Sequence, residues 1–222
     1  MTLDLSNVVL PYKEFYGKNV EQMPKLLAEG RVPLSVAGIM EQRLRSGKQD
    51  WKDNYFDTGD AFAYHPNGNF KIVTDARLLR DITSASKLRN GALVLQDGVY
   101  ESLQGQEFTR KDMEKLVERE LSAEEVKAHP IWNRLARDRA MLTEYVDTMF
   151  AEMNKRFKYT ENMGVYLSSA EKVPTARAAV VFGLEPGSRL CSRYDLVNGD
   201  GRFAGVAPEG AECAGQSASN LV

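Results

Sequence analysis

The segment Thr175–Leu184 constrains the fold more than any other part of this chain. Both of its alternating sets of side chains are apolar or small: Ala178, Val180 and Phe182 in one set, and Ala179, Val181 and Gly183 in the other. Successive side chains of a strand point to opposite faces of its sheet. We therefore predict a central strand that is covered on both faces, which requires other elements to pack on each side of it.

Three further strands are predicted in the same β-rich block (163–207), over residues 164–168, 189–197 and 202–206. Turn-forming residues separate them, at Glu185–Ser188 and at Asn198–Gly201. Asp195, Asn198 and Asp200 also have the oxygen-rich composition of a calcium loop. Because their spacing differs from that of such a loop and no glutamate follows at the required distance, we interpret this segment as a hairpin turn.

A second β-rich block is predicted over residues 54–104. Phe62 and Tyr64 alternate before Asn67-Gly68, and Phe70 and Ile72 alternate after it, which is a strong hairpin pattern. The pattern recurs in Leu93, Leu95 and Val99 around Asp97-Gly98. We predict a hairpin at each place, with a short helical turn between them at 75–81.

The first helical block is predicted over residues 1–50. Asn19 is expected to cap a helix that carries Pro24 in its first turn and ends at Gly30. Ser35 is expected to cap a helix over 36–45, with Arg43 and Arg45 near its negative C-terminal end and Gly47 as its left-handed stop.

The second helical block is predicted over residues 109–158. Thr109 is expected to begin a helix over 110–119, with Asp112 completing a short capping box. Ser122 and Glu125 form a full capping box, and Leu121 and Val126 supply the hydrophobic staple across it.

His129-Pro130 then precedes one long predicted helix, over residues 130–157, because proline is favoured at a first helical position. Apolar residues recur along it at helical spacing and form a stripe that faces a core or a partner. Four of them are candidates for a homodimer interface: Leu142, Val146, Met149 and Met153.

Composition excludes several classes of protein. The 222 residues carry a formal charge of only −2, with acidic and basic side chains interspersed, so no basic surface for nucleic acid is predicted. No window has the apolar length that a membrane span requires, and no signal peptide is evident. The two cysteines, Cys191 and Cys213, have no disulfide or metal spacing, which favours a cytoplasmic location.

The segment 54–73 (NYFDTGDAFAYHPNGNFKIV) contains the densest group of chemically active side chains. A small-molecule site there would use polar groups around the aromatic side chains of Tyr55, Phe56 and Tyr64. The candidate ligand-binding residues are Tyr55, Asp57, Asp60, His65 and Arg77. The alternative interpretation is structural: Asp57 and Asp60 form an Asx-type turn that leads into the hairpin.

Two short patterns in this segment resemble enzyme signatures. Asp57-Thr58-Gly59 resembles the Asp-Thr-Gly of aspartic proteases, which implies a shared pair of carboxylates and hence a homodimer. Tyr55–Asp60 with Asn67-Gly68 resembles the adenylate-forming enzymes, in which the aspartate after Thr-Gly holds the ribose of ATP. Because the helical content is too high for the first family and the phosphate loop of the second is absent, the turn interpretation is preferred.

The two histidines, His65 and His129, each precede a proline, and His129 lies where a helix N-cap is expected. No metal-binding spacing such as HExxH or CxxC is present, and neither a metal nor a cofactor is predicted.

We therefore predict an α+β fold in which antiparallel hairpins pack against amphipathic helices, as one domain over residues 1–208 with a disordered tail at 209–222. Catalytic motifs are lacking, so we expect a non-enzymatic protein that binds another protein or a peptide, and that forms homodimers through the long helix. The alternative is an enzyme that binds a small molecule, such as a nucleotide, at 54–73.

Overall fold

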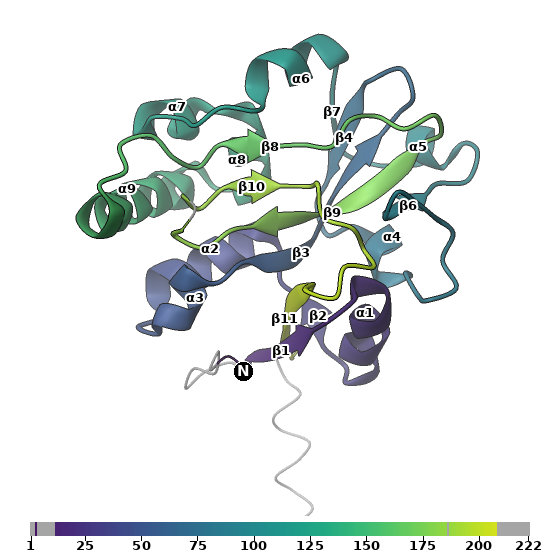
Figure 1. Ribbon diagram of the computed structural model, residues 1–222, viewed down its shortest axis with the longest axis horizontal. Helices are drawn as coiled ribbons and strands as arrows, with labels where there is room; N and C mark the ends of the chain where they lie inside the picture. The colour runs from purple at the N-terminus through teal and green to yellow at the C-terminus, as the bar shows by residue number, and fades with distance from the viewer. Residues whose placement is uncertain (1–2, 4–11, 186, 208–222) are drawn as a thin grey trace, which may run out of the picture.

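The structure, a computed structural model, describes residues 3, 12–185 and 187–207 (Figure 1). The predicted tail and Cys213 lie outside these residues. The described part contains nine helices and one mixed sheet of eleven strands, which confirms the α+β class. In Figure 1, helices α7, α8 and α9 gather at one end of the molecule, and α1, α4 and α5 at the other. No helix in the described ranges combines the length and apolarity that would let it cross a membrane.

The strands follow the sheet order β1-β11-β3-β9-β10-β8, and the other strands attach to this path. Most pairs are antiparallel, as predicted, but β11 with β3 and β10 with β8 are parallel. The strands are β1 (Tyr12–Tyr16), β2 (Val32–Pro33), β3 (Phe56–Tyr64), β4 (Phe70–Val73), β5 (Leu88–Arg89), β6 (Ala92–Val94), β7 (Gln106–Phe108), β8 (Val165–Tyr166), β9 (Thr175–Val181), β10 (Leu190–Cys191) and β11 (Arg202–Val206).

The helices are α1 (Asn19–Ala28), α2 (Val36–Arg45), α3 (Gln49–Asp53), α4 (Arg77–Arg80), α5 (Val99–Ser102), α6 (Arg110–Leu116), α7 (Ala123–Ala128), α8 (Pro130–Ala136) and α9 (Arg139–Phe157). Helix α3 was not predicted. The short turn at 75–81 is confirmed as α4.

Strand β9 is central and buried along its whole length, as its two-sided apolar sequence predicts. Ala179 and Val181 pack into a core cluster with α2, α7, α8 and α9. Ala176 and Ala178, on the opposite face, pack into a second cluster with α1, α4 and α5. Each face of the sheet therefore packs against its own layer of helices.

The predicted hairpin between β3 and β4 is confirmed, with Phe62 opposite Ile72 and Tyr64 opposite Phe70. Its connection includes Asn67-Gly68 and is closed by the backbone N–H of His65, which donates to the carbonyl of Asn69 at 2.9 Å. The second hairpin was misplaced. Strands β5 and β6 join through Asn90-Gly91, where both residues have positive φ, whereas Gly98 precedes α5 as its N-cap.

The capping signals predicted several helix starts correctly. Ser35 caps α2, and the capping boxes of Thr109 and Ser122 begin α6 and α7. Helix α6 ends at Leu116, short of the predicted residue 119, and Gly47 has no left-handed φ. Asn19 is the first residue of α1 and not its cap, because its buried side chain donates to Asp57 instead.

The long predicted helix is two helices. Arg137 adopts a left-handed φ of 64° and separates α8 from α9, while the side chain of Asp138 accepts from the backbone N–H of Met141 and caps α9. The break places the Arg137 guanidinium against Asp60, at 2.9 Å. A contact with a distant strand therefore overrides the helical pattern of the local sequence.

The apolar stripe of α9 faces the protein's own core. Leu142, Val146, Met149 and Met153 are each 0% exposed and belong to the first core cluster. These side chains are not accessible to a second copy of the chain, so the interface that we expected through them is corrected to internal packing.

Candidate functional site

The two aspartates of the 54–73 segment flank an irregularity in the centre of the sheet. The register between β3 and β9 shifts between Asp57 and Ala61, so Thr58 and Gly59 form a bulge. The Thr58 hydroxyl donates to the carbonyl of Ala179 at 2.9 Å and accepts from the N–H of Asp60 at 3.2 Å. The bulge reorients both carboxylates toward segments that are distant in sequence.

Asp57 is buried and connects the start of α1 to the start of β11. Its carboxylate accepts from the Asn19 amide at 3.0 Å and from the backbone N–H of Arg202 at 2.6 Å. Because both donors come from outside the hairpin, the predicted Asx-type turn is wrong at this residue. Both oxygens are engaged, and Asp57 is only 3% exposed, so it offers nothing to a ligand.

Asp60 is fully buried and joins three other segments. Its oxygens accept from the backbone N–H groups of Val36 and Asp75, each at 2.8 Å, and from the Arg137 guanidinium at 2.9 Å. Arg137 also pairs with Asp75 at 2.7 Å. Asp60 is thus a structural acceptor that fixes the start of α2 and the break before α9.

Burial of Asp57 makes stability depend on pH. Burial raises the pKa of this carboxyl from its ordinary value near 4 to about 6. The unfolded chain then releases the proton first, so the contribution of Asp57 to the free energy of unfolding is fully present below pH 4 and is lost as pH rises through 6. This loss is at most about 3 kcal/mol.

We expect Asp57→Asn to remove this part of the pH dependence. The Asn19 amide oxygen has no hydrogen-bond partner in the structure, and an amide flip at Asn19 would place it against the new side chain. Urea unfolding midpoints measured for both proteins between pH 4.5 and 7 should converge at low pH. Parallel curves over this range would contradict the assignment to Asp57.

The remaining candidates of this segment do not converge on Asp57 and Asp60. His65 lies in the hairpin loop, where its ring contacts Tyr100 at 5.0 Å and its Nε2 lies 3.7 Å from Glu101. Arg77 is exposed at the start of α4. The small-molecule site predicted at 54–73 is therefore not formed, and of the five candidates only Tyr55 borders the site described below.

One other sequence interpretation is confirmed, and another is confirmed only in part. His129 is the N-cap of α8, and its Nε2 lies 2.9 Å from the carbonyl of Leu116. The segment with Asp195 and Asn198 is a turn, since the N–H of Asn198 donates to the carbonyl of Asp195 at 2.9 Å. It is not the predicted hairpin turn, because β10 pairs with β8 and β9 whereas β11 pairs with β1, β2 and β3. The Asp195 carboxylate pairs with Arg177 at 2.8 Å. Among the described residues no group of three metal-binding side chains is found.

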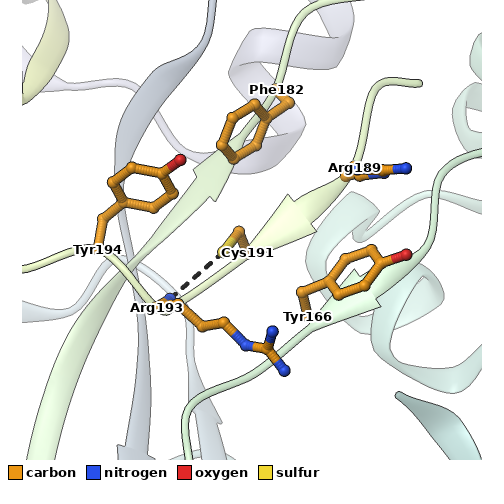
Figure 2. A pocket seen from close by; sticks show the side chains of 6 residues that line it. All are labelled: Tyr166, Phe182, Arg189, Cys191, Arg193 and Tyr194. Carbon is orange, nitrogen blue, oxygen red and sulfur yellow. Dashed lines mark hydrogen bonds between the residues drawn. The ribbon is translucent and has the colours of Figure 1, made fainter. Parts of the chain in front are cut away.

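A pocket of about 340 Å³ lies at the side of the sheet that β10 and β8 form. Its lining residues come from β8, β10 and the segments next to β9 and β10: Tyr166, Phe182, Arg189, Cys191, Arg193 and Tyr194. In Figure 2, Phe182 and Tyr194 lie on one side of Cys191, and Tyr166 lies on the other with an arginine on either flank.

Each pocket arginine contacts the Tyr166 ring and pairs with a glutamate. The guanidinium carbons of Arg189 and Arg193 lie 5.2 and 5.6 Å from the ring centroid, within cation–π range. Arg189 pairs with Glu120 at 2.5 Å, and Glu120 also accepts from the Tyr166 hydroxyl at 2.8 Å. Arg193 pairs with Glu118.

The pocket offers groups that are suited to binding a ligand. Burial raises the pKa of the Cys191 thiol and of the Tyr166 and Tyr194 phenols, so these groups stay protonated near neutral pH. The six lining residues include no histidine or carboxylate that could act as a general base. The groups offered to a ligand are aromatic faces, guanidinium donors and one small buried thiol.

Aromatic and guanidinium groups continue from the pocket across the sheet. Phe182 contacts Tyr194 and Tyr55, with ring centroids 5.5 and 6.0 Å apart. The Arg202 guanidinium then lies 4.8 Å from the Tyr55 ring and 5.2 Å from the Tyr16 ring. We call this set the tyrosine–arginine band: Tyr16, Tyr55, Tyr166, Phe182, Tyr194, Arg189, Arg193 and Arg202.

The band takes residues from six strands in their spatial order, β1, β11, β3, β9, β10 and β8, either at the end of a strand or next to it. Sequence reasoning found only Tyr55, because the other members lie in segments that the sequence predicts merely as strands and turns. A partial signal was present: Arg189, Arg193 and Tyr194 stand next to Cys191 in a segment with few other large polar residues.

No protein-family model and no curated protein matches this chain. A solved structure does match, described as "Accommodation of massive sequence variation in Nanoarchaeota by the C-type lectin fold". The likeness covers 89% of this chain and 98% of that chain, with a TM-score of 0.69 and 15% sequence identity. At this identity the likeness establishes the fold: the chain adopts the C-type lectin fold.

Proposed function

We propose that this protein binds another protein through the tyrosine–arginine band. The observation that carries the proposal is the continuity of the band. Five aromatic side chains and three guanidinium groups, from six adjacent strands, form two contacting groups that meet at one pocket. One group is Arg189, Tyr166 and Arg193, and the other is Tyr194, Phe182, Tyr55, Arg202 and Tyr16. Tyr16 and Tyr194, at 49% and 41% exposed, are two of the three most exposed large apolar side chains in the described part.

The residue types favour a protein partner. Tyrosine and arginine are enriched among the residues that dominate binding energy at protein interfaces. Tyrosine also supplies a large contact area at little entropic cost, because it has only two side-chain torsions. Here the strand backbones fix the positions from which these side chains project, so little order has to be gained on binding.

The charges near the band disfavour a polyanion such as nucleic acid. Each arginine of the band already has a carboxylate partner: Arg189 with Glu120, Arg193 with Glu118, and Arg202 with Glu14 at 2.8 Å. A phosphate backbone binds where positive charges stand unneutralised. The band has balanced charge instead, as at a protein interface that combines aromatic contacts with specific ion pairs.

The matching solved structure supports this proposal at the level of the fold. It is described as a C-type lectin fold that accommodates massive sequence variation. A scaffold of this kind can keep its core while its surface residues change. In the present chain the buried core lies on both faces of β3 and β9, and the band is separate from it, at the ends of the strands.

We expect the double variant Phe182→Ala and Tyr194→Ala to lose at least about tenfold in affinity for the partner, since truncating two central aromatic residues commonly costs more than 1.4 kcal/mol. The partner would be isolated from cell extract by comparing the wild type with this variant, then purified and titrated by calorimetry. Tyr159→Ala, an aromatic truncation outside the band, is the matched control. A purified partner that binds the double variant as tightly as the wild type would refute the proposal, and isolation of nucleic acid alone would point to the rejected alternative.

A further inference from the structure

We infer that Arg193 recognises a carboxylate of the partner protein, and that Glu118 occupies Arg193 until the partner binds. The inference rests on the proposed function and specifies its chemistry: the partner contributes an acidic side chain next to an apolar one. Three observations carry it. The Arg193 guanidinium has a donor nitrogen that bonds to no described residue, its ion pair with Glu118 is exposed, and a cavity lies on either side of that pair.

Arg193 is held in place but not saturated. Its Nε donates to the carbonyl of Leu167 at 3.0 Å, which fixes the plane of the guanidinium beside the Tyr166 ring. Its Nη2 donates to Glu118, and no hydrogen bond joins Nη1 to a described residue. A guanidinium anchored in this way can present two parallel donors to an incoming carboxylate.

The two arginine–glutamate pairs of the pocket differ in exposure. The side chains of Arg193 and Glu118 are 45% and 61% exposed, so water competes with this pair and it contributes little. The side chains of Arg189 and Glu120 are 36% and 26% exposed, and Glu120 is also held by the Tyr166 hydroxyl. The Arg189–Glu120 pair therefore forms part of the pocket wall, and the Arg193–Glu118 pair is the one that a ligand can displace.

Glu118 lies in the connection between α6 and α7, in a conformation that is uncommon for its residue type. Its φ is 67°, and its backbone N–H donates to the carbonyl of Val165 at 2.8 Å. The backbone is thus tied to the edge of β8 while the side chain reaches Arg193. The acid can leave Arg193 by side-chain rotation alone, without any change in this backbone bond.

The pair separates two cavities. Arg193 lines the pocket described above, and Glu118 lines a second cavity of about 320 Å³ together with apolar residues that include Met113, Val117 and Leu167. Rotation of Glu118 away from Arg193 would join the two cavities. The resulting groove fits an extended segment that places an aromatic or aliphatic side chain over Cys191 and its acid on Arg193.

The test uses small probes that carry only the inferred chemistry. The full chain, labelled with ¹⁵N, is titrated with 4-hydroxyphenylacetate, with its uncharged amide and with inorganic phosphate, and amide shifts near Cys191 are followed by NMR. Variants are Arg193→Ala, Glu118→Gln and, as a control, Glu114→Gln, whose acid lines the second cavity but pairs with Arg110.

We expect the carboxylate to bind the wild type and the amide to bind at least about fivefold more weakly, because a hydrogen bond between charged groups is lost. Arg193→Ala should abolish this discrimination. Glu118→Gln should tighten carboxylate binding about two- to fivefold, the range expected from removing an exposed competing ion pair, and leave the amide unaffected. Glu114→Gln should match the wild type.

Equal carboxylate binding by the wild type and Glu118→Gln would overturn the inference, as would discrimination that survives in Arg193→Ala. Binding of inorganic phosphate as tightly as 4-hydroxyphenylacetate would also overturn it, in favour of a free-anion site. The proposed function has a different test, because it is refuted if the double variant Phe182→Ala and Tyr194→Ala still binds the partner as tightly as the wild type. The two refuting results are therefore distinguishable.

Discussion

Replacing Val146 with Asp is expected to unfold the protein and not to dissociate a dimer. Val146 is 0% exposed, and it lies in the core cluster between α9 and the sheet. A carboxylate placed there has no partner and no water, so the folded state must bury a charge or protonate the acid. We expect a loss of more than about 4 kcal/mol and a melting temperature lower by about 10 °C or more.

The measurement is thermal unfolding followed by circular dichroism, with the mass in solution determined in parallel. Ala151→Asp is the matched control, because it adds the same charge to the exposed face of the same helix. The control should change stability by less than about 1 kcal/mol. A Val146→Asp protein that remains folded and only changes its mass would restore the dimer interface predicted from the sequence.

Local signals in the sequence predict where several helices begin and which strand is central. The capping residues Ser35, Thr109 and Ser122 identify helix starts because the cap is a contact between neighbours in sequence. The central position of β9 is likewise predictable, since two-sided apolarity is a property of the strand itself. Neither kind of signal depends on residues that are remote in the sequence.

The break between α8 and α9 shows where such reasoning fails. The apolar stripe runs on at helical spacing, yet the chain turns at Arg137 because its guanidinium pairs with Asp60 and Asp75. The same contact explains why Asp60 is not a ligand group. Neither result can be obtained from local patterns, because each requires two segments more than sixty residues apart.

The candidate site could not be predicted for a related reason. Tyr16, Arg202 and Tyr55 are neighbours in space because β1, β11 and β3 are neighbours in the sheet, whereas they are far apart in the sequence. Strand order is set by the packing of the whole sheet and not by any one strand. Functional groups that gather across a sheet therefore leave no compact motif.

Arg43→Met is expected to destabilise the protein by about 3 kcal/mol or more, although Arg43 is remote from the band. The sequence places Arg43 near the negative C-terminal end of α2, and in the structure this residue is 1% exposed. Its guanidinium donates to the carbonyls of Trp51, Asn54 and Val181, at 2.8, 2.9 and 3.5 Å. It also donates to two hydroxyl groups, those of Tyr145 at 2.8 Å and Ser188 at 3.2 Å.

The size of this loss in stability depends on the groups that accept hydrogen bonds from Arg43. No described carboxylate pairs with Arg43, so its charge is balanced only by oriented dipoles. The substitution removes its hydrogen bonds to three carbonyls and two hydroxyl groups, at about 1 kcal/mol or more for each buried acceptor left unpaired. Arg43→Lys keeps the charge but lacks the planar fork, and should recover less than half of the loss. Urea unfolding of both variants, with the exposed Arg77→Met as control, measures these differences. A stability of Arg43→Met within about 0.5 kcal/mol of the wild type would show that the carbonyls find other donors, and that this buried charge does not hold α2 and α9 against the sheet.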